Sequence, residues 1–293
     1  MAPSALPLEK STALITGASR GIGKALALSL SNAGAFVGII GRRQEALHQV
    51  AGQITDRGGQ AVPLPADVAR PDAIKEAVSR ALEVMGPIDI LVNAAGIQAP
   101  IGPFLENDLL AWEHTIHVNL LGAVRMTHAV LPMMQARRRG KIINFSGGGA
   151  TAPRPCFSAY AASKAALVRF TETLAVELEP YNIQVNAVAP GAVNTRMLEE
   201  VLAAGEKAGA EYEQALERSK SGGTPVDLVC ELVTFLASSA SDRLTGKLIS
   251  APHDPWRAWA GNADKLNNTT LYTLRRLDPF TINSLIKDMI FKF

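Results

Sequence analysis

The stretch Gly17-Ala18-Ser19-Arg20-Gly21-Ile22-Gly23 follows the short apolar run Thr12–Thr16 and opens a helical segment that extends to about Ala33. A second apolar run, Phe36–Ile40, comes next. This order predicts a βαβ unit whose first turn holds the glycines, where the backbone can approach a diphosphate at the helix N-terminus. The spacing Gly-x-x-x-Gly-x-Gly differs from the common Gly-x-Gly-x-x-Gly, and a plain tight turn is the alternative interpretation.

Helical segments and short Val- and Ile-rich runs alternate along the chain to about residue 250. The expected further strands are 61–65, 88–92, 141–145, 183–189 and 246–250. The expected helices are 43–57, 71–85, 107–135, 157–178 and 226–238. This alternation predicts one α/β domain, a doubly wound parallel sheet of about seven strands in three α/β/α layers. We expect residues 1–250 to form this domain and residues 251–293 to form a C-terminal extension.

The composition is that of a globular chain without a bias toward a charged partner. Of its 293 residues 47% are hydrophobic, which is enough for a substantial core. The formal net charge is +2, from 29 basic and 27 acidic residues, so no nucleic-acid partner is expected. The basic run Arg137–Arg139 with Lys141 is interpreted as a solvated helix end.

Cysteine, histidine and apolar patterning exclude further classes of protein. Two cysteines, Cys156 and Cys230, provide no disulfide framework and favour a reducing, cytoplasmic compartment. We expect neither secretion nor a membrane span, because the chain has no signal-like start and no long uncharged apolar run. His114 and His117 share a helical face without a suitable acidic or Cys partner, so no metal site is expected.

The end of the second expected strand bears on the choice between NAD and NADP. An acidic residue at this position binds the ribose 2′-hydroxyl, whereas basic residues accommodate a 2′-phosphate. The chain has Gly41-Arg42-Arg43 there and Arg20 in the glycine turn, which favours NADP(H). The alternative is that these arginines are solvated at the strand end. Asp67-Val68 follows the third strand, where Asp67 could equally be a helix cap or turn residue.

Tyr160 and Lys164 lie one helical turn apart, on the same face of an expected helix. A free phenol titrates near pH ~10 and is a poor proton donor or acceptor at neutral pH. A neighbouring ammonium favours the phenolate and moves its pKa toward a useful range. Alone the spacing is a weak signal, because many helices carry it on a solvated face.

Several motifs, in order and at suitable intervals, resemble the short-chain dehydrogenase/reductase family, in its branch similar to 3-oxoacyl-carrier-protein reductases. The motifs are Thr16–Gly23, Asn93-Ala94-Ala95-Gly96, Asn119, Tyr160 with Lys164, and Pro190-Gly191-Ala192-Val193-Asn194-Thr195. The resemblance covers roughly residues 9–250. It implies a Rossmann-type domain that transfers a hydride between nicotinamide C4 and a carbonyl or alcohol carbon.

The resemblance also implies a role for each matching residue. Tyr160 would exchange the proton of the substrate oxygen, and Lys164 would lower the pKa of Tyr160 and bind the nicotinamide ribose. Asn119 would anchor a water that relays protons to Lys164. Thr195 and Val193 would hold the carboxamide of the nicotinamide. The other cofactor-binding residues would be Gly17, Ser19, Arg20, Gly21, Ile22, Gly23, Arg42, Arg43, Asp67, Val68, Asn93, Ala94, Gly96, Pro190 and Gly191.

One position departs from the family pattern, which places a substrate-binding serine thirteen residues before the tyrosine. Here that position is Gly147, and Ser146 precedes it. A shift of one residue reverses the direction of a side chain in a strand, but the following glycines leave the backbone free to redirect it. Ser146 is our candidate for the fourth catalytic residue; Thr151 or Ser158, or no serine at all, are the alternatives.

Two further segments stand outside the regular alternation. Residues 196–224 are helical and charged, with Met197 and Leu198 among their apolar residues, which suits a lid over the substrate. The extension 251–293 contains two of the three tryptophans, Trp256 and Trp259, and is too apolar for a free tail. We expect it to pack on the body or on a partner subunit.

Together these observations predict an NADP(H)-preferring oxidoreductase, with NAD(H) possible as cofactor, that acts on a small-molecule ketone/secondary-alcohol pair. A homodimer or homotetramer is expected by analogy with the family. Two alternatives stay open: a catalytically silent nucleotide-binding or sensing protein on the same fold, and an epimerase that retains its cofactor. Gly147 supports the silent protein, whereas Tyr160, Lys164 and Asn119 argue against it.

Overall fold

A parallel sheet positions most of the candidate cofactor-binding residues at the carboxyl ends of its strands. A computed structural model describes residues 6–279, 281–283 and 286 of the chain. Seven strands pair in the order β3-β2-β1-β4-β5-β6-β7, and each neighbouring pair is parallel. The strands are β1 (Thr12–Thr16), β2 (Phe36–Gly41), β3 (Gln60–Pro65), β4 (Ile90–Asn93), β5 (Gly140–Phe145), β6 (Ile183–Ala189) and β7 (Leu248–Ser250). The chain reverses its direction of winding between β1 and β4, where open α/β sheets bind ligands.

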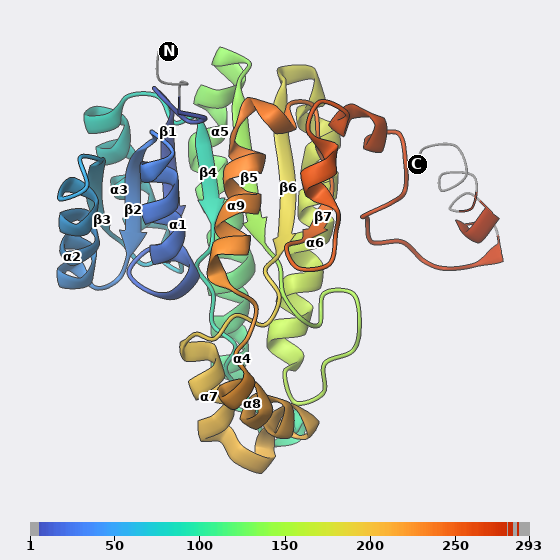
Figure 1. The fold of residues 1–293 in the computed structure, drawn as a ribbon. Coiled ribbons are helices and arrows are strands. Elements are labelled where there is room, and N and C mark those ends of the chain that lie inside the picture. Colours follow the sequence, from blue (N-terminus) through green and yellow to red (C-terminus); the bar gives the residue numbers. More distant parts are fainter. Residues whose placement is uncertain (1–5, 280, 284–285, 287–293) are drawn as a thin grey trace.

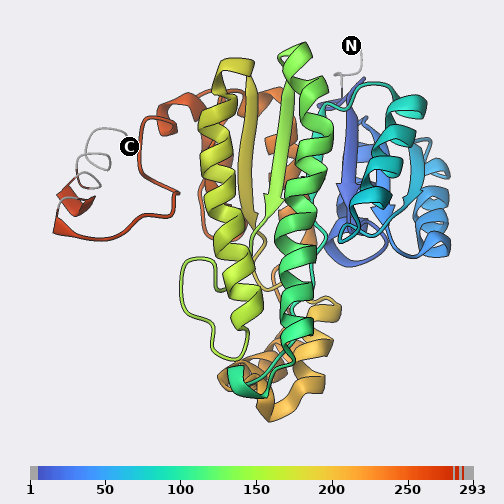
Figure 2. The ribbon, with the colours of Figure 1, turned by 180° about the vertical axis from the view of Figure 1, so that it is seen from behind.

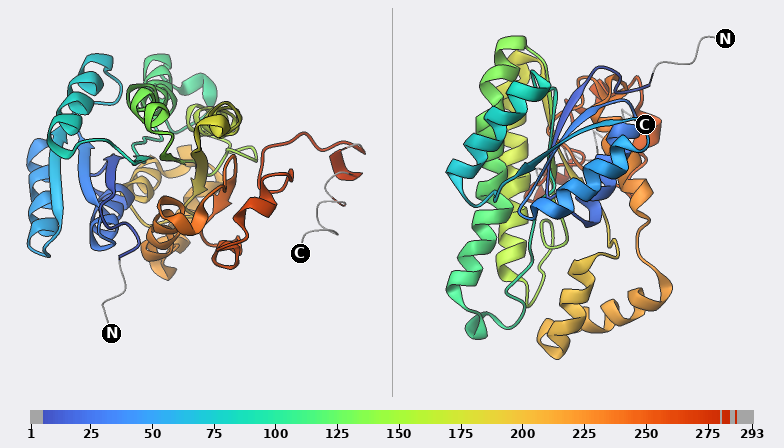
Figure 3. Two further views of the ribbon diagram at one scale, coloured as in Figure 1. Left: turned by 90° about the horizontal axis from the view of Figure 1, so that it is seen from above. Right: turned by 90° about the vertical axis from the view of Figure 1, so that its left-hand side faces the viewer.

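Helices cover both faces of this sheet (Figures 1–3). One face carries α1 (Gly21–Asn32), α2 (Gln44–Thr55) and α9 (Val226–Ala237), whose buried apolar residues form one core cluster with the inward side chains of the strands. The other face carries α3 (Pro71–Met85), α5 (Gly122–Arg137) and α6 (Ser158–Leu178) around a second cluster. The predicted three-layer, doubly wound, single-domain fold is therefore confirmed.

The helix predicted as continuous over 107–135 is divided in the structure. It consists of α4 (Leu109–Ile116), a π-helical turn (His117–Leu121) and α5. The side chain of Asp108 caps the start of α4 by accepting a hydrogen bond from Leu110 N at 3.0 Å. Such wide turns interrupt a helix locally and re-aim a side chain, and this one contains Asn119.

Two helices extend beyond the carboxyl ends of the strands, below the sheet in Figure 1. They are α7 (Arg196–Ala204) and α8 (Ala210–Ser221), joined by a short 3₁₀ turn (Gly205–Ala208). Their apolar faces pack with Phe157 and Tyr160 in a separate small cluster. The predicted lid segment therefore stands directly over the start of α6.

The chain after β7 lies against the edge of the sheet as far as Leu274, whose N–H donates to Glu172 of α6. The described residues that follow run outward from the body (Figure 1). Trp256 and Trp259 are buried in the core cluster beside α9, and the Trp259 ring packs 4.7 Å from that of Tyr272. Tyr272 O accepts a hydrogen bond from Leu248 N at 2.7 Å. The ammonium of Lys247, itself 2% exposed, donates to backbone carbonyls of this segment. Residues 280, 284–285 and 287–293 of the expected extension lie outside the described residues. No helix in the described part of the chain is long and apolar enough to cross a membrane.

Candidate active site

A cleft of about 780 Å³ lies at the carboxyl ends of β1, β2 and β4 and reaches the start of α7. The sequence-predicted residues that line it are Gly17, Ser19, Arg20, Gly21, Ile22, Gly23, Arg42, Arg43, Asp67, Val68, Ala94, Gly96 and Thr195. The fold thus brings together residues from five separate segments of the chain. A cleft of this volume suits a dinucleotide-sized ligand.

The glycine turn brings backbone atoms close together at one wall of the cleft. A Cβ on Gly17 would lie 2.8 Å from Ala95 Cα, and one on Gly23 would lie 2.3 Å from Gly17 O. Only glycine fits such contacts without a shift of the backbone. Arg20, the N-cap residue of α1, makes no side-chain cap, so the first N–H groups of α1 remain for another acceptor. The turn therefore fits the diphosphate of a dinucleotide.

Four guanidinium groups gather at the far end of the cleft. Arg42 and Arg43 follow β2 directly, Arg20 lies in the glycine turn, and Arg196 begins α7. Burial and the neighbouring charge of Arg196 lower the pKa of Arg20. Arg196 forms an ion pair with Glu200 at 3.3 Å. This concentration of positive charge fits an anionic group such as a phosphate.

The side chains of two sequence-predicted residues make hydrogen bonds within the protein. Asp67 Oδ1 accepts a hydrogen bond from Ala69 N at 2.9 Å, which is the turn-aspartate geometry weighed as its alternative role. The side chain of Asn93 is buried and donates to Asn144 Oδ1 at 2.9 Å, so it points into the sheet layer and does not line the cleft. The expected lining by the Asn93 side chain is not seen, because Asn144 and Thr127 take its amide NH2 group within the sheet layer, while its Oδ1 is buried without a partner among the described residues.

Tyr160 and Lys164 lie in the first turns of α6 and are both buried, at 7% and 3% exposure. Lys164 Nζ donates to Phe145 O at 2.7 Å and lies 5.5 Å from the centre of the Tyr160 ring. Burial raises the pKa of Tyr160, and burial lowers the pKa of Lys164 to about 8. In this arrangement the phenol keeps its proton at neutral pH, and the expected lowering of the Tyr160 pKa by Lys164 is not seen.

Asn119 and Lys164 meet beside Gly96, which lines the cleft. The Cβ position of Gly96 lies 3.4 Å from Asn119 Oδ1 and 3.6 Å from Lys164 Nζ. The Asn119 amide also holds Ile97, accepting from Ile97 N at 2.9 Å and donating to Ile97 O at 2.8 Å. Its third hydrogen bond goes to Ser163 Oγ at 3.0 Å. The π-helical turn thus fixes one side of the loop after β4 against α6.

The three candidate serine and threonine hydroxyls differ in burial and in hydrogen bonding. Ser146 Oγ is buried and has no hydrogen-bond partner among the described residues. Ser158 Oγ accepts from Trp112 Nε1 at 3.0 Å, and Thr151 is exposed on the loop. A Cβ on Gly147 would lie 2.2 Å from the Tyr160 hydroxyl oxygen. The space of the family's usual serine side chain is therefore occupied by Tyr160 itself.

The segment after β6 packs close to the cleft, but only part of it lines the cleft. Thr195 caps α7, accepting from Met197 N at 3.3 Å, and its methyl group lies 3.6 Å from the Cβ position of Gly21. Pro190 is buried, Val193 is half-buried, and Gly191 lies against Thr224 and Pro252. These three residues do not line the cleft.

Sequence reasoning missed several residues that the fold brings to the site. Arg154, from the loop between β5 and α6, pairs with Glu211 of α8 and stacks on Tyr160. Buried Gln98 donates to Met197 O at 2.5 Å, which ties α7 to the loop after β4. Arg196 joins the arginines described above. Each pair is remote in sequence, so no local pattern could have revealed it.

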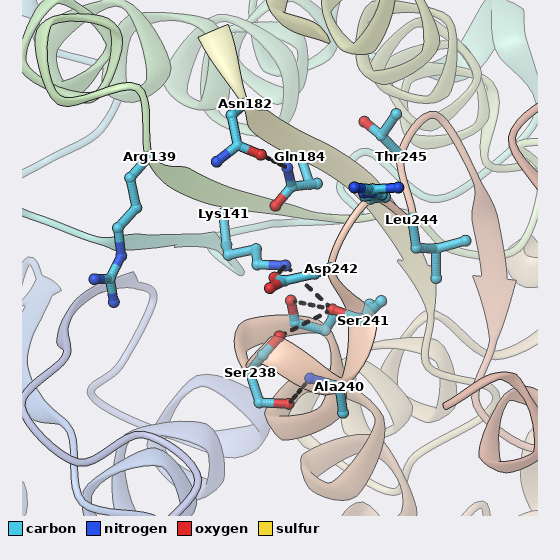
Figure 4. A network of polar contacts seen from close by, with 12 residues as sticks. Arg139, Lys141, Asn182, Gln184, Ser238, Ala240, Ser241, Asp242, Leu244 and Thr245 are labelled. Atoms are coloured by element: carbon cyan, nitrogen blue, oxygen red, sulfur yellow. Dashed lines mark hydrogen bonds and ion pairs between the residues drawn. The ribbon is translucent and has the colours of Figure 1, made fainter. Parts of the chain in front are cut away.

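A second, polar cavity of about 430 Å³ lies at the opposite edge of the sheet, near the amino ends of β4, β5 and β6. Figure 4 shows Lys141 pointing toward Asp242, at 2.7 Å, and toward Ser241. Asp89 is paired with Arg137 at 3.0 Å. The charged side chains around this second cavity are thus largely paired with one another. The described residues contain no group of His, Cys, Asp or Glu side chains that could hold a metal ion.

The parallel sheet, the glycine turn at its switch point and the buried Tyr160–Lys164 pair define a dinucleotide-dependent oxidoreductase of the Rossmann type. Residues 11–205 match the short chain dehydrogenase family, over more than half of the chain. The protein belongs to this family, and it is an NAD(P)-dependent oxidoreductase that acts on a CH-OH/C=O pair.

Similar proteins cover most of the chain. The chain is 39% identical over 246 residues to the 3-oxoacyl-acyl-carrier-protein reductase FabG of Thermotoga maritima, and the match covers 83% of this chain and 96% of that protein. A short chain dehydrogenase of Pseudocercospora fijiensis is 42% identical over 192 residues, which span 65% of this chain and 62% of the relative.

Two solved structures superpose closely. An NAD+-bound xylitol dehydrogenase gives a TM-score of 0.78 at 27% identity, over 83% of this chain and 98% of its own. A gluconate 5-dehydrogenase from Burkholderia cenocepacia, in complex with NADP and tartrate, gives 0.75 at 34% identity, over 85% and 96%. Proteins of this fold thus bind either dinucleotide.

Proposed function

We propose that this protein is an NADP(H)-preferring oxidoreductase that interconverts a ketone and a secondary alcohol, with Tyr160 as the general acid/base. The observation that carries this proposal is the convergence of Lys164 and Asn119 beside Gly96, the one of the three that lines the cleft. Tyr160 lies one helical turn before Lys164. A buried lysine with a lowered pKa, next to a candidate dinucleotide site, is typical of a functional site more than of a purely structural one.

Each residue has a distinct part in the proposed reaction. The bound nicotinamide supplies or accepts the hydride. Tyr160 holds its proton at neutral pH, because burial raises its pKa, and so can donate it to the carbonyl oxygen during reduction. Lys164, with its pKa lowered to about 8, can exchange a proton near neutral pH and so restore that of Tyr160. Asn119 keeps the loop at Ile97 in place beside them.

Ser146 is the proposed fourth member of this group. Its hydroxyl is buried and has no partner among the described residues, and a buried unpaired hydroxyl is unfavourable unless another group comes to satisfy it. A substrate oxygen beside Tyr160 would be such a group. The proposal places Ser146 as a hydrogen-bond donor to that oxygen, in the role that the family's usual serine would have.

The preference for NADP(H) rests on the arginines at the end of β2. Arg42 and Arg43 line the cleft, with Arg20 opposite, and no acidic residue stands at the end of the strand. A 2′-phosphate would find two or more guanidinium donors there, whereas a free ribose hydroxyl would find no carboxylate partner. Arg42→Asp should lower the NADPH/NADH ratio of kcat/KM by at least about tenfold. Equal use of both cofactors by the parent enzyme would contradict the preference.

The central test is Tyr160→Phe, which removes the proton and keeps the ring. Oxidation of NADPH with a panel of ketones should be detected for the parent and fall by about 10²–10⁴-fold in the variant. A parent that binds NADPH tightly but reduces no ketone would support the silent nucleotide-binding protein. Retained cofactor with interconversion of stereoisomers, and no net turnover, would support the epimerase.

We also infer a cytoplasmic homodimer or homotetramer that assembles through α5 and α6, with residues 251–293 as an extension that packs on the body or on a partner subunit. This inference rests on analogy with the family. Light scattering coupled to size exclusion would measure the assembly. A monomer at working concentration would oppose this inference.

A further inference from the structure

An ion pair joins the lid to the loop before α6. Arg154 Nε and Nη2 donate to the two carboxylate oxygens of Glu211 at 2.5 and 2.7 Å. The two side chains are only 15% and 21% exposed. A bidentate, partly buried pair of this kind is stronger and more directional than an exposed one. It connects α8 to a loop more than fifty residues away in sequence.

The same guanidinium covers the catalytic tyrosine. Arg154 Cζ lies 3.9 Å from the centre of the Phe157 ring and 4.9 Å from that of Tyr160. Both distances are within the range of cation–π contact. Gly149 permits this approach, because a Cβ there would lie 3.1 Å from Arg154 Cβ. The turn of three glycines therefore lets Arg154 fold back over Tyr160.

Other charged and titratable groups face Tyr160 from each neighbouring element. Lys164 approaches from α6 at 5.5 Å, and Glu211 approaches from α8 through Arg154. Cys156 and Tyr212 belong to the small apolar cluster around Phe157 and Tyr160. The Arg154 charge lowers the pKa of Tyr160 and the Glu211 charge raises it, against a larger increase that burial causes.

We infer that Arg154 and Glu211 are positioning residues for Tyr160, which hold the lid against the catalytic loop and set by their opposed charges the electrostatic field at the phenol. The inference rests on the proposed role of Tyr160. It assigns a part in the chemistry to two residues that never touch the cofactor cleft. It also couples the position of α8 to the acidity of the phenol, because a lid that moves away takes the Glu211 carboxylate with it.

The two partners should affect the phenol in opposite directions. Arg154→Gln removes the cation, so the pH midpoint of Tyr160 should rise by about one unit, as expected for one charge several ångströms away. Glu211→Gln removes the anion and leaves the cation, so the midpoint should fall by about half a unit or more. A pair that only braced the lid would give no shift, or shifts of the same sign, in both variants.

Two readouts measure the midpoint. The first is the pH profile of kcat/KM for a ketone that the parent enzyme reduces. The second needs no turnover: it is the ultraviolet absorbance titration of the phenols, from which the same titration of Tyr160→Phe is subtracted. Arg257→Gln is the matched control, because it breaks an exposed arginine–glutamate pair with Glu231 outside the site. It should shift neither readout.

Milder variants protect the test against misfolding. Arg154→Lys keeps the cation but not the bidentate geometry, so it should keep the midpoint within about 0.3 unit while raising KM several-fold. Glu211→Asp should behave likewise. Shifts of equal sign in Arg154→Gln and Glu211→Gln, or no shift above about 0.2 unit in either of these two variants when folded, would overturn the inference. If Tyr160→Phe loses activity but the Arg154 and Glu211 variants show no such shifts, only the present inference is refuted. If Tyr160→Phe keeps full activity, the proposed function is refuted as well.

Discussion

Replacing Gly147 by serine restores the residue that the family usually has, yet the structure predicts a loss of activity. A Cβ at this position would lie 2.2 Å from the Tyr160 hydroxyl oxygen. The shortest ordinary carbon–oxygen contacts are about 3.3 Å, so the hydroxyl would have to move by about 1 Å. Because the Tyr160 ring is buried, the ring cannot make this movement without disturbing its neighbours.

The size of the loss follows from that displacement. A catalytic group misplaced by about 1 Å can cost about 10²-fold in rate, equivalent to about 2.7 kcal/mol of transition-state stabilisation. Overpacking of a buried site costs a further ~1–3 kcal/mol of folding free energy. We therefore expect Gly147→Ser to lower kcat/KM by about two orders of magnitude and to lower the melting temperature by several degrees.

Two matched variants isolate the steric cause. Gly147→Ala adds only the Cβ and should lose about as much activity as the serine variant. Gly148→Ser is the control, because a Cβ there meets nothing closer than Arg154 at 3.9 Å, and it should stay close to the parent. Steady-state kinetics with NADPH and an accepted ketone, together with thermal unfolding, measure all three. If Gly147→Ser were as active as the parent or more active, the reasoning would be refuted.

Three further outcomes follow from buried polar groups. Ser146→Ala removes an unpaired buried hydroxyl, so it should leave the free energy of unfolding unchanged or raise it by about 1 kcal/mol. The kcat of this variant should fall about 10²–10³-fold. Lower stability with unchanged kcat would argue against the proposed role of Ser146. Burial depresses the pKa of Lys164 to about 8, so the unfolded chain binds more protons between pH 8 and its ordinary value of 10.5. The free energy of unfolding of the parent, relative to Lys164→Met, should therefore rise with pH across that window in urea titrations, and a flat or falling difference would contradict the depressed pKa. Lys247→Met leaves carbonyls such as Thr269 O unpaired and should cost about 2–3 kcal/mol in the same assay, whereas Lys75→Met, at an exposed position, should cost almost nothing.

The alternation of apolar strands and amphipathic helices was sufficient to predict the fold. Parallel strands buried on both faces appear as continuous apolar runs, and their order along the chain limits the possible topologies. The break of the helix at Asn119 was not predictable, because a π-helical turn has no local sequence signal. It depends on the contacts that Asn119 makes with Ile97 and Ser163, which belong to two other elements.

Candidate residues could be identified from sequence where a local motif carries the chemistry. The glycine turn, the arginines after β2 and the Tyr160–Lys164 spacing are of this kind, because the residues of each motif lie within a few positions of one another in the sequence. The direction of the Asn93 side chain was beyond such reasoning. It is decided by a partner on the neighbouring strand, Asn144, and by the buried environment that they share.

The sequence by itself therefore determined the sheet, the position of the glycine turn and the tyrosine–lysine pair, because each depends on local spacing and apolar periodicity. Only the tertiary structure decided what surrounds Tyr160. Gly147 opposes its hydroxyl, Arg154 covers its ring, and Glu211 reaches it from the lid. These contacts join segments far apart in the chain, and the packing of buried side chains in three dimensions selects them.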